Sequence, residues 1–111
     1  MKVFDLHTTM WHETQPGAKG CFLHSAKMTV GTWEFDANVS LPMHSHPHEQ
    51  ILMVTKGSIE LTLGDEKRVL EAGNMVIVPP DVIRGVTTIT RAAVTDVFSP
   101  VREDFKKRFG E

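Results

Sequence analysis

The sequence predicts an all-β protein, a sandwich or barrel of short strands followed by one short helix at the C-terminus. Short runs rich in aliphatic and β-branched residues follow one another along the chain, and turn residues such as Gly57 and Gly64 separate them. Ile59, Leu61 and Leu63 alternate with polar residues, which indicates a strand with one buried face. With 111 residues, the chain is long enough for one domain, residues 1–111, around a single hydrophobic core.

The expected elements begin after a turn-rich N-terminal segment that ends with residues 15–20. Gly57 and the cluster Gly64-Asp65-Glu66 are typical of hairpin turns between neighbouring strands. The expected strands span residues 21–25, 28–35, 51–55, 58–63, 68–71, 75–78, 84–90 and 92–98. The core barrel therefore extends over about residues 21–98.

The run from Ile51 to Val54 is apolar on both of its faces. If Gln50, Leu52 and Val54 line the interior, then Ile51 and Met53 lie on the outer face, where exposure of these apolar side chains to water is unfavourable. A second copy of the chain is the simplest cover, so we expect a homodimer.

The C-terminal segment has the features of one short helix over about residues 100–109. Ser99 can act as the N-cap, Pro100 suits the first helical position, and acidic residues precede basic ones. Phe105 and Phe109 are four residues apart and share one face, and Gly110 ends the helix.

The bulk composition excludes several classes of function. The net charge is −2 and no stripe of Lys and Arg lies outside the tail, so nucleic acid is not an expected partner. No stretch is apolar over the length that a membrane span needs. Cys21 is the single cysteine, which fits a reducing compartment. We expect a cytoplasmic protein that acts on a small molecule.

The segment after Pro42 is the strongest candidate for a functional site. His44 and His46 are two residues apart in extended backbone, so their imidazoles project from the same face, and Gln50 follows at the same parity. Two imidazoles and a third donor suit one divalent metal ion such as Ni, Zn, Fe or Mn. His48 also has the right parity and is an alternative ligand, although the preceding proline can turn it aside.

Arg84 follows a second patterned segment, which runs from Gly73 through Pro79 and Asp81. A guanidinium has no lone pair to donate, so Arg84 cannot itself be a metal ligand. It has three alternative placements. In the first, Arg84 points inward and binds a carboxylate of the substrate. In the second, it replaces the metal as the cation of the site. In the third, it points outward and water is the fourth ligand of the metal.

Asp96 lies between Val94 and Phe98 at the same parity of an expected strand. A carboxylate on an apolar inner face can act as acid or base, whereas the opposite strand orientation would place Asp96 in solvent. Arg102 precedes the tail helix, and an arginine at such a position is most often solvated.

Two motifs in this chain resemble those of the cupin superfamily, H-x-H-x(3,4)-E-x(6)-G and G-x(5)-P-x-G-x(2)-H-x(3)-N. The first matches His44, His46 and Gly57, with Gln50 in the place of the Glu. The second matches Gly73 and Pro79, with Asp81 in the place of the second Gly and Arg84 in the place of the His. Residues from about 30 to 105 are similar to the small pectin-degradation cupins of the KdgF type.

This resemblance implies a double-stranded β-helix barrel of the jelly-roll type with a metal ion on His44, His46 and Gln50. It also implies that Asp96, Phe98 and Arg102 line the substrate pocket. The expected activity is an isomerase-type reaction of carbohydrate metabolism, the metal-dependent opening and tautomerisation of unsaturated uronates or a related small hydroxy acid. A cupin dioxygenase and a non-catalytic cupin that binds a sugar or an anion are the alternatives.

Overall fold

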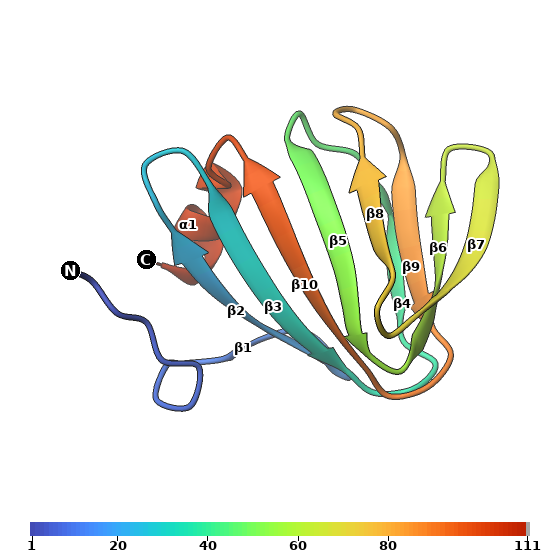
Figure 1. The fold of residues 1–111 in the computed structure, drawn as a ribbon, viewed down its shortest axis with the longest axis horizontal. Coiled ribbons are helices and arrows are strands. Elements are labelled where there is room, and N and C mark those ends of the chain that lie inside the picture. The colour runs from blue at the N-terminus through green and yellow to red at the C-terminus, as the bar shows by residue number, and fades with distance from the viewer. Residues whose placement is uncertain (111) are drawn as a thin grey trace.

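The computed structural model, which describes residues 1–110, consists of two antiparallel β-sheets that face one another and one short helix (Figure 1). The larger sheet has six strands in the order β1-β2-β3-β10-β5-β8, and the smaller has four in the order β4-β9-β6-β7. The strands are β1 His12–Gln15, β2 Ala18–His24, β3 Thr29–Phe35, β4 Ser40–His44, β5 Glu49–Lys56, β6 Ser58–Leu63, β7 Glu66–Glu71, β8 Met75–Val78, β9 Arg84–Thr88 and β10 Ala92–Ser99, and the helix is α1 Glu103–Phe109. The predicted all-β class is confirmed.

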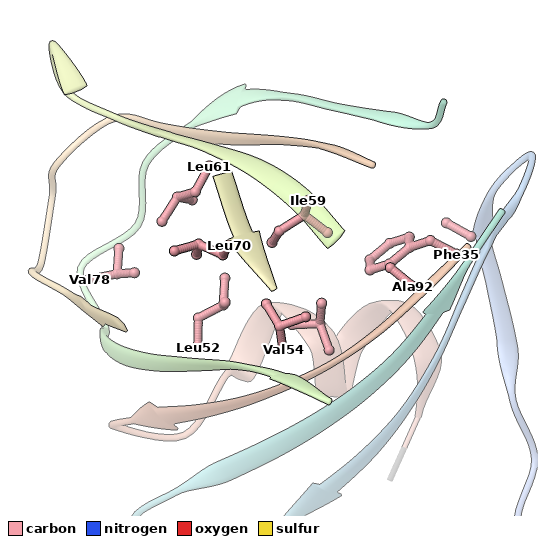
Figure 2. Close-up of a cluster of buried hydrophobic side chains, with 10 residues drawn as sticks. Phe35, Leu52, Val54, Ile59, Leu61, Leu70, Val78 and Ala92 are labelled. Atoms are coloured by element: carbon pink, nitrogen blue, oxygen red, sulfur yellow. The ribbon is translucent and has the colours of Figure 1, made fainter. Parts of the chain in front are cut away.

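The hydrophobic core lies where the inner faces of the two sheets meet. Figure 2 shows side chains of the larger sheet, such as Val54 and Val78, pointing toward Ile59 and Leu61 of β6 in the smaller sheet. The alternation along β6 makes Ile59 and Leu61 buried, while the polar residues between them are only partly buried. Each such aliphatic side chain stabilises the fold by about 1.5–3 kcal/mol when fully buried.

Helix α1 covers the part of the inner face that the smaller sheet does not reach (Figure 1). Phe105 and Phe109 lie with their ring centroids 4.8 and 5.0 Å from that of Phe22 on β2. Beside Phe22 in the register, β3 has Gly31, where a Cβ atom would stand only 3.3 Å from the Phe22 ring. The aromatic residues of the helix and of β2 therefore close one end of the space between the sheets.

Two strands were not predicted, β1 and β4. Both lie at the end of the strand order in their sheets, where only one neighbour is available. Pro42 lies inside β4 and has no N–H to donate, so it argues against a central strand and is compatible with an edge. The strands predicted at residues 58–63 and 75–78 have the observed bounds of β6 and β8.

The predicted start of the helix was wrong. The helix begins at Glu103 rather than near Pro100, with Arg102 at the N-cap position and no side-chain cap. Ser99 does not cap it because Ser99 is the last residue of β10, paired with Glu49 of β5. The order of charges was predicted correctly, and Gly110 follows the last turn with φ 80°.

The outer face of the larger sheet presents apolar side chains. As predicted, Leu52 and Val54 are buried, whereas Ile51 is exposed and Met53 is half-buried. Ile51 pairs with Ile77 of β8, which is 68% exposed. No helix within residues 1–110 is long and apolar enough to cross a membrane.

Candidate functional site

A cavity of about 320 Å³ lies between the two sheets at the end that α1 closes. Its apolar walls include Leu52, Leu61, Val78, Val86, Val94 and Phe98. Its polar lining includes Gln50, Arg84, Asp96 and Arg102, each of them buried, together with His46. Candidate residues from β5, β9, β10 and the start of α1 thus meet in one space.

Asp96 faces this cavity because the register of β10 places it on the inner face beside Leu52 of β5. Its Oδ1 accepts a hydrogen bond from Nε2 of Gln50 at 2.8 Å. Burial raises the pKa of Asp96 to about 6, even though the hydrogen bond from Gln50 and the charges of Arg102 and Arg84 favour the carboxylate. The site therefore holds a carboxyl group that changes protonation state near neutral pH.

Arg84 points inward and is held from two sides. The turn before it contains Asp81 at φ 65°, a left-handed conformation that Asp tolerates in the place of a motif glycine. Nε of Arg84 donates to the carbonyl of Val82 at 2.9 Å, and Nη2 donates to the carbonyl of Pro79 at 2.8 Å. Its third nitrogen, Nη1, lies 3.2 Å from Oε1 of Gln50 and 2.5 Å from Nε2 of His46.

Arg102 is buried as well, contrary to the solvated position that is usual for an arginine before a surface helix. Nε and Nη2 of Arg102 donate to the two carboxylate oxygens of Asp104 at 2.9 and 2.7 Å. The guanidinium lies over the rings of Phe105 and Phe98, at 3.7 and 4.6 Å from their centroids. The hydrogen bonds and charge of Arg102 lower the pKa of Asp104 to about 2. Asp104 was not predicted, and its spacing two residues after Arg102 was the available signal.

The histidines of the first motif occupy three different environments. His44 is exposed, and its Nδ1 lies 2.9 Å from the carbonyl of Pro42. His46 is buried against Arg84, and burial together with the charges of Arg102 and Arg84 lowers its pKa to about 3. His48 is buried with Nε2 at 3.2 Å from the carbonyl of Val101, so this nitrogen is occupied. His46 is thus a neutral imidazole whose Nε2 accepts a hydrogen bond from Arg84.

Two of the three donors that the sequence predicted for a metal ion, His46 and Gln50, meet at Arg84 instead, and the third, His44, is exposed. Zn–N distances at histidine are about 2.0–2.1 Å, so an ion bound to Nε2 of His46 would overlap Nη1 of Arg84. Oε1 of Gln50, the third predicted donor, accepts from the same Nη1. No three His, Cys, Asp or Glu side chains within residues 1–110 are arranged to hold a metal ion. In this arrangement the donor set fits a guanidinium and does not fit a metal.

Comparisons with known proteins agree with the sequence motifs. The model of the cupin domain matches residues 31–98. The pectin degradation protein KdgF of Dickeya dadantii (strain 3937) is 34% identical over 85 residues, which are 75% of this chain and 68% of that protein.

Two solved structures share both the fold and a moderate identity. KdgF from a Halomonas species superposes with a TM-score of 0.89 at 29% identity, over 95% of this chain and 98% of the other. An RmlC-like cupin from Shewanella frigidimarina superposes with a TM-score of 0.88 at 29% identity, over 92% and 93% of the two chains.

Proposed function

This chain belongs to the cupin family, and we propose that it opens and tautomerises a small unsaturated uronate. Two matched relatives, from Dickeya dadantii and Halomonas, carry the name KdgF, and the first is described as a pectin degradation protein. Pectin is a polymer of uronates, and its eliminative cleavage leaves a sugar acid with a double bond in the ring. The cavity lining includes the buried carboxyl group of Asp96 and the buried guanidinium groups of Arg84 and Arg102, which suits a substrate that carries both a carboxylate and hydroxyl groups.

The proposed reaction is an isomerisation, so no oxidant or reductant is needed. The bond between the ring oxygen and the anomeric carbon breaks, and the anomeric hydroxyl loses its proton to become an aldehyde. The enol that remains at carbon 5 then gains a proton at carbon 4 and becomes a ketone. One group that takes and returns a proton is sufficient for these steps.

The main observation that supports this proposal is the burial of Asp96 in the cavity with a raised pKa. This pKa is about 6, so the carboxylate of Asp96 is available as a base and its acid form is within reach near neutral pH. Arg84 polarises an oxygen of the substrate with its fixed positive charge. Arg102, which has its Nη1 outside the pairing with Asp104, holds the substrate carboxylate.

The test is turnover of 4,5-unsaturated galacturonate by the purified protein. The expected result is loss of the ultraviolet absorbance of the conjugated double bond, with proton NMR showing the linear keto aldehyde. Saturated galacturonate serves as the matched control and should remain unchanged. Thermal stabilisation by both sugars without turnover would contradict the proposal and support a binding module, and oxygen uptake would support oxidative chemistry.

Changing Arg102 to Lys is expected to raise KM for the uronate by about tenfold or more, because Lys keeps the charge but loses the planar fork that pairs with a carboxylate. Asp104→Asn is the matched control, since it disturbs the ion pair of Arg102 but leaves the guanidinium itself in place. Steady-state kinetics at one pH measures both variants. An unchanged KM in Arg102→Lys would remove Arg102 from substrate binding.

We also propose that the outer face of the larger sheet joins two copies of this chain. One register row across five strands, Leu23-Val30-Val97-Ile51-Ile77, is entirely aliphatic. In the single chain Leu23, Ile51 and Ile77 are 44%, 43% and 68% exposed. Such a row exposes apolar area that a two-fold related copy covers with the same residues.

Ile77→Lys is expected to shift the protein from dimer to monomer, because a charge at the β8 end of that row would be desolvated in the dimer. Val69→Lys is the matched control, because Val69 is 50% exposed on β7 of the other sheet and lies outside the row. Sedimentation velocity at micromolar concentration compares both with the unmodified protein. A monomer in the unmodified protein would refute the homodimer.

A further inference from the structure

Arg84 lies at the centre of the site, where all three of its nitrogens donate hydrogen bonds. Its three nitrogens donate to four groups: the carbonyls of Val82 and Pro79, Oε1 of Gln50 and Nε2 of His46. Arg84 is 3% exposed, so bulk water contributes little to the stabilisation of its charge. The two backbone carbonyls aim Nη1 at the point where the imidazole and the amide oxygen converge.

A divalent ion and this guanidinium exclude one another. Both require the lone pair of His46 Nε2 and the oxygen of Gln50, and both carry positive charge in a cavity of low dielectric constant. For an ion to bind, Arg84 would have to give up its contacts to His46 and Gln50 and move away. The carbonyls that hold Nε and Nη2 oppose such a movement.

Gln50 has the orientation that an arginine and an aspartate together require. Its Oε1 accepts from Arg84 at 3.2 Å, and its Nε2 donates to Asp96 at 2.8 Å. A glutamate at this position would pair with Arg84 but would place its second oxygen against a carboxylate oxygen of Asp96, where the two carboxylates repel unless they share a proton. The two departures from the cupin motifs, Gln50 for Glu and Arg84 for His, therefore fit each other.

The metal centre of the motif and the Arg84–Gln50 centre of this chain also have the same formal charge. A divalent ion with one glutamate and neutral histidines gives the centre a formal charge of about +1, and an arginine with a glutamine gives the same value. The centre therefore presents the same formal charge to Asp96 in either case, and Arg102 adds its own positive charge to both.

We propose that the guanidinium of Arg84 is the resident cation of this site, that it excludes divalent metal ions, and that it binds a ligand oxygen that carries negative charge. Within the described residues, four of the five N–H groups of Arg84 have protein partners, which leaves one for a carboxylate or enolate oxygen. This inference deepens the proposed function by naming the electrophile, but it does not rest on the reaction, since metal binding is measured without substrate.

The experiment measures binding of Co²⁺ and Ni²⁺ to the tag-free protein by calorimetry, with the visible absorbance of bound Co²⁺ as an independent signal. The unmodified protein is expected to bind neither ion up to millimolar concentration. Arg84→His and the pair Arg84→His/Gln50→Glu restore the residues of the motif. At least one of these variants is expected to bind one equivalent about 100-fold more tightly or better.

Circular dichroism and thermal unfolding show which of the two variants folds, and the His44→Ala/His46→Ala version of that variant is the control for the ligand set. Binding of one equivalent by the unmodified protein, lost in its own His44→Ala/His46→Ala variant, would overturn the inference. Failure of the folded motif variants to bind would overturn it too, since Arg84 would then not be what excludes the metal. Neither result would by itself contradict uronate turnover, which the activity assay tests separately.

Discussion

Asp96→Asn is expected to lower the turnover of unsaturated galacturonate by about 100-fold or more, because an amide cannot exchange the proton that opens the ring. The substitution preserves shape and keeps an oxygen that can accept the hydrogen bond from Gln50. Binding of the sugar is therefore expected to survive, with the loss confined to kcat. Stopped-flow or steady-state absorbance measures the rate. A rate equal to that of the unmodified protein would show that another group moves the proton.

The same variant is expected to be more stable than the unmodified protein at neutral and alkaline pH. Because burial raises the pKa of Asp96 from 3.8 to about 6, the folded protein binds more protons than the unfolded chain between these values. Ionised Asp96 therefore costs stability as pH rises through this window, on the order of 2–3 kcal/mol above it. The uncharged amide of the variant carries no such cost, so the gain in unfolding free energy should appear near pH 8 and vanish below about pH 4.

Asp104→Asn is the matched control for this pH dependence, because the pKa of Asp104 is shifted in the opposite direction, to about 2. A lowered pKa contributes stability above the unfolded value of 3.8, and this contribution is lost as pH falls through about 2. Asp104→Asn should therefore be less stable than the unmodified protein at neutral pH. The effect should be small, because the Asp104 side chain is 58% exposed and solvent screens its pair with Arg102. Urea titrations at pH 8 and at pH 4 measure the free energy of unfolding of both variants. An equal gain in this free energy for Asp96→Asn at the two pH values would contradict a buried charge on Asp96.

Gly57→Ala is expected to destabilise the protein by about 3 kcal/mol or more, the largest effect on stability that we predict. Gly57 has φ 72°, and a Cβ there would overlap the carbonyl oxygen of Arg91, which belongs to the backbone and cannot rotate away. The strain of the left-handed conformation adds about 1 kcal/mol. This clash explains why the glycine of the first motif stands at the turn between β5 and β6.

Gly64→Ala is the matched control, because Gly64 has φ 58° but its Cβ would meet only Val82 Cγ1 at 3.7 Å. Its expected cost is the conformational strain alone, about 1 kcal/mol. Urea unfolding midpoints with equal m-values compare the two variants. Equal losses would mean that the contact with Arg91 relaxes and that only the backbone conformation matters.

Local pattern was sufficient for much of the fold. A period of two along residues 58–63 requires one face of β6 to be buried, whichever sheet it joins, and the motif glycine marks the turn before it. The same parity argument placed Gln50 with Leu52 and Val54 on the inner face of β5. β1 and β4 show no such alternation of buried and exposed residues, and β4 also contains a proline, so these two strands were missed.

The site was only partly predictable from the sequence. Parity restricted Asp96 to one of two faces, and the pairing of β10 with β3 and β5 decided between them. The burial of Arg102 also depends on contacts far away in the chain, since its backbone N–H donates to Oγ1 of Thr29 on β3, and no local pattern shows such a contact.

The sequence by itself determined the fold class, the first motif and the departure at Arg84, because these follow from residue type and spacing. Only the tertiary structure decided that Arg84 points inward to Gln50 and His46. An arginine side chain has several rotatable bonds. Two carbonyls in the turn just before Arg84 hold Nε and Nη2, but the acceptors of Nη1 come from Gln50 on β5 and from His46 just before β5, far away in the chain.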